Sequence, residues 1–456
     1  MMMICRKMLK DLEEWRGREH KSLLIDGPRG VGKTALVREF ARSEGSELLE
    51  VDISRNAEAR RLFQSHHEPD DIVSGLEDIT GQEVDGNTLI LLDEVQDCPR
   101  ARQSLKWFTD DGRYDVIATG SMIGWECSSR YRELFTENGR RPLIHHCSEE
   151  HLTLRGLDFE EFLWATGVDE RVTEGIRECI SDISPIDDDL MKDMMDLFGD
   201  FMQTGGMPTS VGRYLVKRDP KDTVSTRDRI ISGFPEDAFG YAGRYGKDAL
   251  RCLDMVCDTM RKEERMIHAD IDDLETMEGL GWLYYSGLGI FCGNVDRPTR
   301  IFNRIHWSRD SKVHIHDTGI LARMYGEETE RSLSEGRLNT DDGALLENII
   351  AECMVKSGIT PSCFSMDVGE GRMELDFVTV LGCRNTGIEV DSGRERDTMH
   401  IDGISRVFDM DRLIVFDDGN IYYEEDDDIE HYPYFCAAFM DSMVDRCEQD
   451  LWHPSI

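Results

Sequence analysis

The sequence predicts an α/β protein whose N-terminal part is a parallel sheet with helices on both faces. Short apolar runs alternate with stretches of helical periodicity, which is the pattern of parallel α/β sheets. One run, Ser22–Asp26, is followed directly by the glycine-rich loop Gly27–Thr34. Another run, Leu89–Asp93, ends in the adjacent carboxylates Asp93 and Glu94. Both runs are nearly uninterrupted, as expected of strands that are buried on two sides.

The elements expected in residues 1–155 follow from this alternation. In chain order, we expect a helix over Met3–Trp15, a strand over Ser22–Asp26, a helix over Thr34–Ser43, strands over Leu48–Ile53 and Thr88–Asp93, a helix over Pro99–Phe108 and a strand over Asp115–Gly120. The last strand ends among polar residues, Thr119 and Ser121. Because the carboxyl ends of parallel strands share one edge of a sheet, these side chains are expected near the glycine-rich loop.

From about residue 156 the pattern becomes mainly helical. Helices are expected over Phe159–Ala165, 187–200 and Ile271–Ser286, with a turn at Gly205–Pro208 and short strands near Ile301–Trp307 and Lys312–His316. Helices followed by a β-hairpin favour a helical and winged-helix region over residues 156–330.

The last part, residues 335–445, has an α+β pattern. We expect a helix over Ala344–Lys356, a hairpin of Glu374–Leu381 and Gly387–Val390, and a strand over Leu413–Phe416. The acidic run Glu424–Glu430 has no basic residue and is expected to be a solvated loop.

Composition limits the partners and the cellular location that we expect for the protein. The 456 residues carry a formal net charge of −39, so the chain as a whole repels nucleic acid and anionic membranes. The 13 cysteines form no C-x-x-C pair, which argues against zinc ribbons and redox motifs, and their irregular spacing fits reduced thiols. No apolar stretch approaches the roughly 18 residues of a membrane span, and the N-terminus lacks the apolar core of a signal peptide. We therefore expect a cytoplasmic protein without a membrane partner.

The loop fits G-x-x-x-x-G-K-[ST], a pattern that wraps phosphates. Backbone N–H groups of residues 29–34 at a helix N-terminus supply converging donors, and glycines permit the tight curve. Lys33 is expected to reach the β- and γ-phosphates, and the Thr34 hydroxyl to ligate Mg²⁺. The predicted cradle is Gly27, Pro28, Arg29, Gly30, Val31, Gly32, Lys33 and Thr34.

The carboxylates at the end of the apolar run Leu89–Asp93 can bind the metal ion and activate water. Asp93 is expected to hold Mg²⁺ through water, and Glu94 to orient or deprotonate the attacking water. Thr119 or Ser121 can sense the γ-phosphate, and Ser121 is preferred. A transition-state arginine is also expected. Its candidates, among which the sequence does not choose, are Arg130, Arg132, Arg140 and Arg141. Since no N-K-x-D guanine signature is evident, the predicted ligand is ATP.

These motifs and several others resemble the bacterial and archaeal AAA-type ATPases with a C-terminal domain of unknown function. The stretches that carry the resemblance are Gly27–Thr34, Leu89–Pro99, Asp111–Gly124, Leu157–Gly167, Gly205–Pro208, His316–Leu321 and Gly343–Asn348. They spread over nearly the whole chain. The resemblance implies an AAA-like P-loop core over residues 1–155, a helical and winged-helix middle, and a C-terminal domain similar to PD-(D/E)xK nucleases.

A PD-(D/E)xK site needs carboxylates for Mg²⁺ and a lysine beside the attacking water. The resemblance places the carboxylates at Glu347, Asp376 and Glu389, but Asp391 stands where the lysine is expected. Arg394 or Arg396 is a poor replacement, because arginine does not readily carry a proton. A metal could still bind among these carboxylates, yet the change favours a degenerate structural or binding domain over a nuclease.

A basic segment contrasts with the acidic chain. Residues 297–314 include Arg297, Arg300, Arg304, Arg309 and Lys312, with His306, His314, Phe302 and Trp307 between them. Such a segment can contact phosphates of DNA, or it can pair with acidic neighbours inside the protein.

The favoured interpretation is a Mg²⁺-dependent ATPase that acts as a molecular switch. The alternatives are a nucleotide-gated nucleic-acid-binding regulator and, less favoured, a metal-dependent nuclease. The sequence leaves the protein partner and the oligomeric state open.

Overall fold

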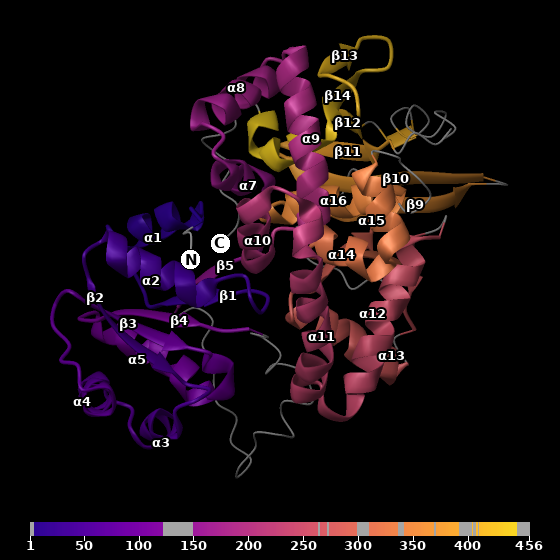
Figure 1. Cartoon of the computed structure of the whole chain (residues 1–456). Helices are drawn as coiled ribbons and strands as arrows, with labels where there is room; N and C mark the ends of the chain where they lie inside the picture. The colour runs from indigo at the N-terminus through magenta and orange to yellow at the C-terminus, as the bar shows by residue number, and fades with distance from the viewer. Residues whose placement is uncertain are drawn as a thin grey trace. The chain divides into compact units, whose positions relative to one another are not determined.

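The computed structural model describes residues 4–121, 149–262, 265–270, 273–298, 310–335, 342–368, 371–391, 404, 407–408 and 410–444 (Figure 1). The chain divides into two compact units. The smaller holds residues 5–155, 285–287 and 456, and the larger holds 1–4, 156–284 and 288–455. Within the described residues, no helix has both the length and the apolar character needed to cross a bilayer.

Over its described residues, the smaller unit is built on a parallel sheet of five strands in the order β2-β3-β4-β1-β5. Its strands are β1 (Leu23–Asp26), β2 (Glu47–Asp52), β3 (Thr88–Asp93), β4 (Asp115–Thr119) and β5 (Glu150–Thr153). Its helices are α1 (Met8–Arg16), α2 (Lys33–Ser43), α3 (Ala57–Ser65), α4 (Pro69–Thr80), the 3₁₀ turn η1 (Val95–Asp97) and α5 (Pro99–Asp111). The predicted parallel α/β core is therefore confirmed.

Helices cover both faces of this sheet, with α1 and α2 on one side and α3, α4 and α5 on the other (Figure 1). All six residues of β3 are buried, because alternate side chains point into the two layers. Ile90 and Leu92 of this strand pack among Phe63, Leu76 and Phe108 of the α3–α5 layer. Burial on two sides explains why the sequence of this strand is continuously apolar.

Several predicted boundaries differ from the observed ones. The first helix begins at Met8 rather than Met3, and the helix at Pro99 continues to Asp111. Gly112 ends that helix with a φ of 73°, which is the left-handed C-terminal residue common after helices.

The larger unit begins with helices. They are α7 (Phe159–Thr166), α8 (Glu170–Ser181), α9 (Asp188–Thr204), α10 (Pro208–Lys217), η4 (Pro220–Thr223), α11 (Val224–Tyr241), η5 (Gly243–Tyr245), α12 (Gly246–Met260) and α13 (Leu274–Tyr285). Aromatic side chains hold the first of them together: Phe162 of α7 lies 5.2 Å from Phe201 of α9 and 5.1 Å from Tyr214 of α10, measured between ring centroids.

The remaining strands of the larger unit form a second sheet. Its strands are β6 (Ile267–His268), β7 (Gly289–Asn294), β8 (Asp310–Ile315), β9 (Ser362–Val368), β10 (Gly371–Leu381), β11 (Arg384–Val390), β12 (Arg412–Asp417), β13 (Tyr422–Glu424) and β14 (Ile429–Pro433). The helices are α14 (Thr318–Tyr325), α15 (Glu327–Ser334), α16 (Asp342–Lys356) and η6 (Tyr434–Met443).

Among the described residues this sheet has nine strands, in the order β13-β14-β12-β11-β10-β9-β7-β8-β6. The predicted hairpin of β10 and β11 is confirmed, with Phe377 opposite Ile388. The predicted strand near Lys312 is β8, and its partners are β7 and β6. The other predicted strand, Ile301–Trp307, lies outside the described residues. Strands β7 and β8 thus belong to the same sheet as the C-terminal strands.

The acidic run Glu424–Glu430 is not wholly a solvated loop, as its charge suggested. Glu424 ends β13, a turn follows, and Glu430 lies buried in β14. Arg412 of β12 donates to Glu430 Oε1 at 2.8 Å, so a cation from a distant segment neutralises the carboxylate.

Candidate functional site

The glycine-rich loop joins β1 to α2 and depends on residues without a side chain. Gly27, Gly30 and Gly32 have φ angles of 141°, 84° and 97°, a region that other residues rarely adopt. A Cβ atom on Gly27 would lie 2.0 Å from the carbonyl oxygen of Leu154. Gly32 also caps α2, so the free N–H groups of that helix face the loop. The loop is therefore built to receive an anion at a helix N-terminus.

Lys33 lies at the centre of this loop, with 6% of its surface exposed. Its Nζ donates to the carbonyl oxygens of Gly27 and Pro28, at 2.9 and 3.0 Å, and to Ser121 Oγ at 2.9 Å. Burial lowers the pKa of Lys33, and Glu94 and the neighbouring aspartates oppose the shift. The ammonium is thus held where phosphate oxygens can take over its hydrogen bonds.

The next residue meets the carboxylate at the end of β3. Thr34 Oγ1 donates to Asp93, with 3.0 Å to each carboxylate oxygen. Thr119 Oγ1 donates to the same Asp93 from β4. In the sheet β4 lies between β1 and β3, which explains why Thr119 and Ser121 end beside the loop and beside Asp93.

The hydroxyl of Thr34 and the carboxylate of Asp93 fit a Mg²⁺ ion that completes its coordination with water and phosphate. Within the residues that the structure describes, no three His, Cys, Asp or Glu side chains are arranged to hold a metal ion. A site with one carboxylate and one hydroxyl agrees with that finding, because Mg²⁺ in nucleotide sites uses few protein ligands.

Glu94 has an unusual backbone and a partner that the sequence did not reveal. Its φ of 58° and ψ of 50° are left-handed, which turns the chain out of β3 into η1. Gln96 Nε2 donates to Glu94 Oε2, and the Ser121 backbone N–H donates to Gln96 Oε1 at 3.1 Å. Gln96 therefore connects Glu94 to the residue that contacts Lys33. The only signal in the sequence is a polar residue two positions after Glu94.

A histidine–carboxylate pair borders the loop on its other side. His151 Nε2 of β5 lies 3.2 Å from Asp26 Oδ2, at the end of β1. The hydrogen bond to Asp26 raises the pKa of His151. Burial raises the pKa of Asp26, but the hydrogen bond and charge of His151, together with Thr153 and Arg155, lower it overall. Each shift favours the charged form of its group, and the sequence had not indicated either residue.

The remaining predicted residues of the loop differ in exposure. Arg29 and Gly30 are exposed, whereas Pro28 and Val31 are buried. The four candidate arginines lie outside the described residues: Arg130, Arg132, Arg140 and Arg141.

The predicted C-terminal carboxylates come together in part. Glu347 of α16 and Asp376 of β10 are buried, and both contact Lys312 of β8. Glu389 of β11 is 9% exposed, and Asp391 is exposed at the end of that strand. The negative charge of Asp391 thus lies at the surface of the unit.

In the basic segment 297–314, Lys312 pairs with acidic neighbours inside the protein, which is one of the two alternatives that the sequence left open. Lys312 and His314 are each 1% exposed, so neither belongs to a DNA-contacting surface. Arg297 is exposed, and residues 299–309 lie outside the described residues.

Three stretches that carry the resemblance meet in one buried network of the larger unit. They are Gly205–Pro208, His316–Leu321 and Gly343–Asn348. Asp317 Oδ2 accepts from the Gly206 N–H at 2.8 Å, and the Asn348 amide bonds the N–H and C=O of Ile315 at 2.7 and 2.9 Å. These amide and carboxylate contacts join a turn, a strand end and a helix. We therefore interpret the three stretches as segments that stabilise the fold of the larger unit.

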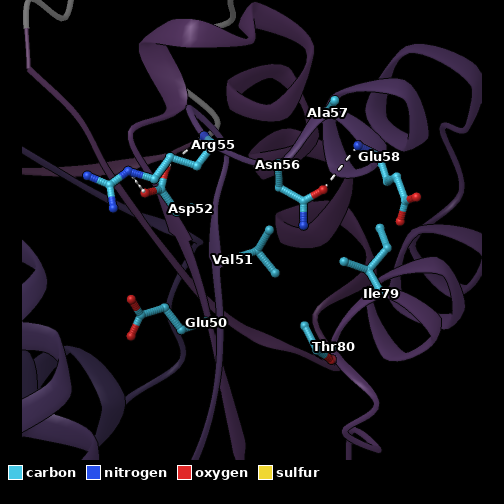
Figure 2. Close-up of a pocket in the computed structure, with 9 residues that line it drawn as sticks. All are labelled: Glu50, Val51, Asp52, Arg55, Asn56, Ala57, Glu58, Ile79 and Thr80. Carbon is cyan, nitrogen blue, oxygen red and sulfur yellow. Dashed lines mark hydrogen bonds and ion pairs between the residues drawn. The ribbon is translucent and has the colours of Figure 1, made fainter.

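An open hollow lies at the end of β2 beside α3 and α4 (Figure 2). Asn56 in this hollow accepts from the backbone N–H groups of Glu58 and Ala59, both at 3.0 Å, and so caps α3. Asp52 pairs with Arg55 at 3.4 Å. These polar groups serve the local fold, and we assign no ligand to the hollow.

The loop, the buried lysine and the carboxylates at the end of β3 define a P-loop nucleoside-triphosphate-binding fold. Residues 19–163 match a family model described as an AAA domain, and this range contains all of these groups. Residues 19–163 are therefore similar to AAA domains, and the geometry of the P-loop agrees with that match.

No curated protein matches the chain. Among solved structures it is similar to a Walker-type ATPase of Pyrococcus abyssi, with 14% identity, coverage of 72% of this chain and 96% of the other, and a TM-score of 0.41. A TM-score this low does not establish a shared fold, so the class rests on the family match and the geometry of the site.

Proposed function

We propose that the protein binds ATP with Mg²⁺ at the glycine-rich loop, hydrolyses it and acts as a molecular switch. The observation that carries this proposal is the convergence of Lys33, Thr34, Asp93 and Ser121 through hydrogen bonds, with Glu94 beside them. Each is a residue type that phosphoryl transfer requires in that position.

In this proposal each side chain has a separate task. Lys33 donates to the β- and γ-phosphates, and Thr34 and Asp93 hold Mg²⁺. Bound Mg²⁺ neutralises charge that develops on the phosphates. Glu94 accepts a proton from the attacking water, and Ser121 reports the γ-phosphate. In this proposal, phosphate oxygens that enter the loop replace the contact between Lys33 and Ser121, and this exchange of partners is the switch.

Two substitutions test the nucleotide site. Lys33→Ala should abolish detectable ATP binding, and Glu94→Gln should retain binding but lower turnover by about 10²–10⁴-fold, the usual contribution of a general base. Nucleotide affinity by calorimetry and phosphate release report the two effects separately. Lys10→Ala and Glu58→Gln, at exposed positions of the same unit, are the matched controls.

Wild-type protein without ATPase activity, together with unchanged nucleotide affinity in Lys33→Ala, would contradict the proposal. Equal turnover in Glu94→Gln and wild type would remove the role of Glu94 alone.

We further propose a C-terminal fold similar to PD-(D/E)xK nucleases over residues 335–445. It is supported by the helix α16, the antiparallel strands β9, β10 and β11, and β12 parallel to β11. For residues 156–330 we keep the winged-helix proposal, since helices precede the antiparallel strands β7 and β8. A cytoplasmic location is proposed from the free thiols of the described cysteines.

The rival function, nucleotide-gated DNA binding, is tested by mobility-shift titration at low salt with and without ATP. Because Lys312 and His314 are buried, fewer basic groups remain for such a contact. The absence of a shift for wild-type protein would exclude the rival.

A further inference from the structure

The larger unit contains a lysine ammonium surrounded by carboxylates. Lys312 Nζ lies 3.1 Å from Glu347 Oε1, 3.1 Å from Glu374 Oε1 and 3.2 Å from Asp376 Oδ1. The three carboxylates come from α16 and β10, whereas the lysine comes from β8. The side chains of Lys312, Glu347 and Asp376 are between 0 and 3% exposed, so the cluster lies in the core of the unit.

For two of the three predicted metal ligands, Glu347 and Asp376, the second carboxylate oxygen is also bound by the protein. Arg265 NH1 donates to Glu347 Oε2, and the Val390 backbone N–H donates to Asp376 Oδ2 at 3.0 Å. Both carboxylates thus use one oxygen for Lys312 and the other for a second protein donor. Each oxygen of these two groups therefore already faces a cation or an N–H.

The charges of the cluster nearly balance. Two cations, Lys312 and Arg265, face three carboxylates. Burial would lower the pKa of Lys312, but Glu347, Asp376 and Glu374 raise it well above its ordinary value. Ion pairs that are buried and hydrogen-bonded in this way hold segments together, because an unpaired charge in the core is very costly.

Oxygen ligands from carboxylates are what Mg²⁺ and Mn²⁺ prefer, and Glu347 and Asp376 are the positions expected to hold such an ion. We infer that the Lys312 ammonium occupies the place of a divalent cation in this cluster, so that the C-terminal carboxylates hold a resident cation instead of a metal. The cluster then ties β8 to α16 and β10, and metal-dependent nucleic-acid cleavage is absent.

The test is a titration of the full-length protein with Mn²⁺ in the absence of nucleotide. All proteins carry Asp93→Asn, which silences the N-terminal metal site. The otherwise unchanged protein should bind no Mn²⁺. Lys312→Ala removes the ammonium and should gain a saturable Mn²⁺ site that the unchanged protein lacks, since a divalent ion can then neutralise the carboxylates. Lys192→Ala, at an exposed position of α9, should gain none.

The gained site should disappear in Lys312→Ala combined with Asp376→Asn. Saturable Mn²⁺ binding to the protein with an intact cluster would overturn the inference, as would a folded Lys312→Ala protein that binds no Mn²⁺. Lys312→Met, which keeps the side-chain length, replaces Lys312→Ala if that variant does not fold. If neither variant folds, the Mn²⁺ titration of the protein with the intact cluster is the test, and saturable binding there would overturn the inference. None of these outcomes depends on ATPase activity.

Discussion

Gln96 connects the two halves of the nucleotide site at the level of single side chains. Its amide nitrogen donates to Glu94 and its amide oxygen accepts from the Ser121 backbone, while Ser121 Oγ accepts from Lys33. Glu94 itself has a left-handed backbone, a conformation that costs non-glycine residues of order 1–3 kcal/mol and persists when surrounding contacts maintain it. Gln96 is therefore a positioning residue for Glu94.

Gln96→Ala is expected to lower the kcat for ATP by about tenfold and to leave KM nearly unchanged, because it frees the Glu94 carboxylate without touching the phosphate loop. Gln96→Glu should have a larger effect, since it places a negative charge beside Glu94. Steady-state ATPase kinetics measure both, with Gln103→Ala on α5 as the control glutamine. A change confined to KM would show that Gln96 acts on binding.

The pair His151–Asp26 predicts a dependence of stability on pH. The raised pKa of His151 contributes stability that is present below 6.5 and lost as pH rises through the folded-state value. The lowered pKa of Asp26 contributes stability that is present above 3.8 and lost as pH falls through its folded-state value. Together these shifts make the charged pair most stabilising between about pH 4 and 6.5.

His151→Asn should thus lower the melting temperature more at pH 5.5 than at pH 8.5. The His151 side chain is 46% exposed, so solvent screens the ion pair. The loss in free energy of unfolding at pH 5.5 should therefore exceed the loss at pH 8.5 by only roughly 0.5 kcal/mol. Thermal unfolding at the two pH values measures it, with the exposed His66→Asn as control. Equal losses at both pH values would mean that the charged pair does not contribute.

At the level of elements, β5 shapes the glycine-rich loop. It lies beside β1, with Asp26 opposite Thr153, and the Leu154 N–H donates to the Asp26 carbonyl at 2.8 Å. This pairing brings the Leu154 carbonyl against Gly27. The requirement for glycine at the first position of the loop therefore comes from a strand more than a hundred residues later.

Gly27→Ala is expected to destabilise the protein by about 3 kcal/mol or more, since the new Cβ meets a backbone oxygen and the φ is unfavourable. Gly45→Ala is the matched control: its φ is 66°, but nothing lies within 4 Å of the added Cβ. That change should cost only about 1–2 kcal/mol. Denaturant unfolding separates the two, and similar losses would show that β5 does not constrain the loop.

For the whole molecule, the dominant property is a net charge of −39. Charge of one sign repels itself and destabilises the compact state, whereas the charges of the buried cluster at Lys312 nearly balance. Salt screens exposed charges much more than buried pairs.

The melting temperature should consequently rise when NaCl increases from about 0.05 M to about 0.5 M, over which the Debye length falls severalfold. Differential scanning calorimetry at constant pH measures this. A fall in melting temperature would mean that exposed ion pairs contribute more to stability than the self-repulsion removes.

The sequence by itself determined the N-terminal core and most members of its site. The phosphate loop is a local motif, and continuously apolar runs are buried strands in a parallel sheet, so residues close in sequence carry both signals. The predicted site residues all lie at the edge of this sheet where the parallel strands β1, β3 and β4 end: Lys33, Thr34, Asp93, Glu94 and Ser121. Only the tertiary structure revealed Gln96 and His151, because their partners depend on which strands are neighbours. It also decided between the two alternatives that the sequence left open for Lys312, a DNA contact or a pair with acidic neighbours. Lys312 lies in the core, where its carboxylates come from two later elements that sheet pairing and helix packing alone bring together.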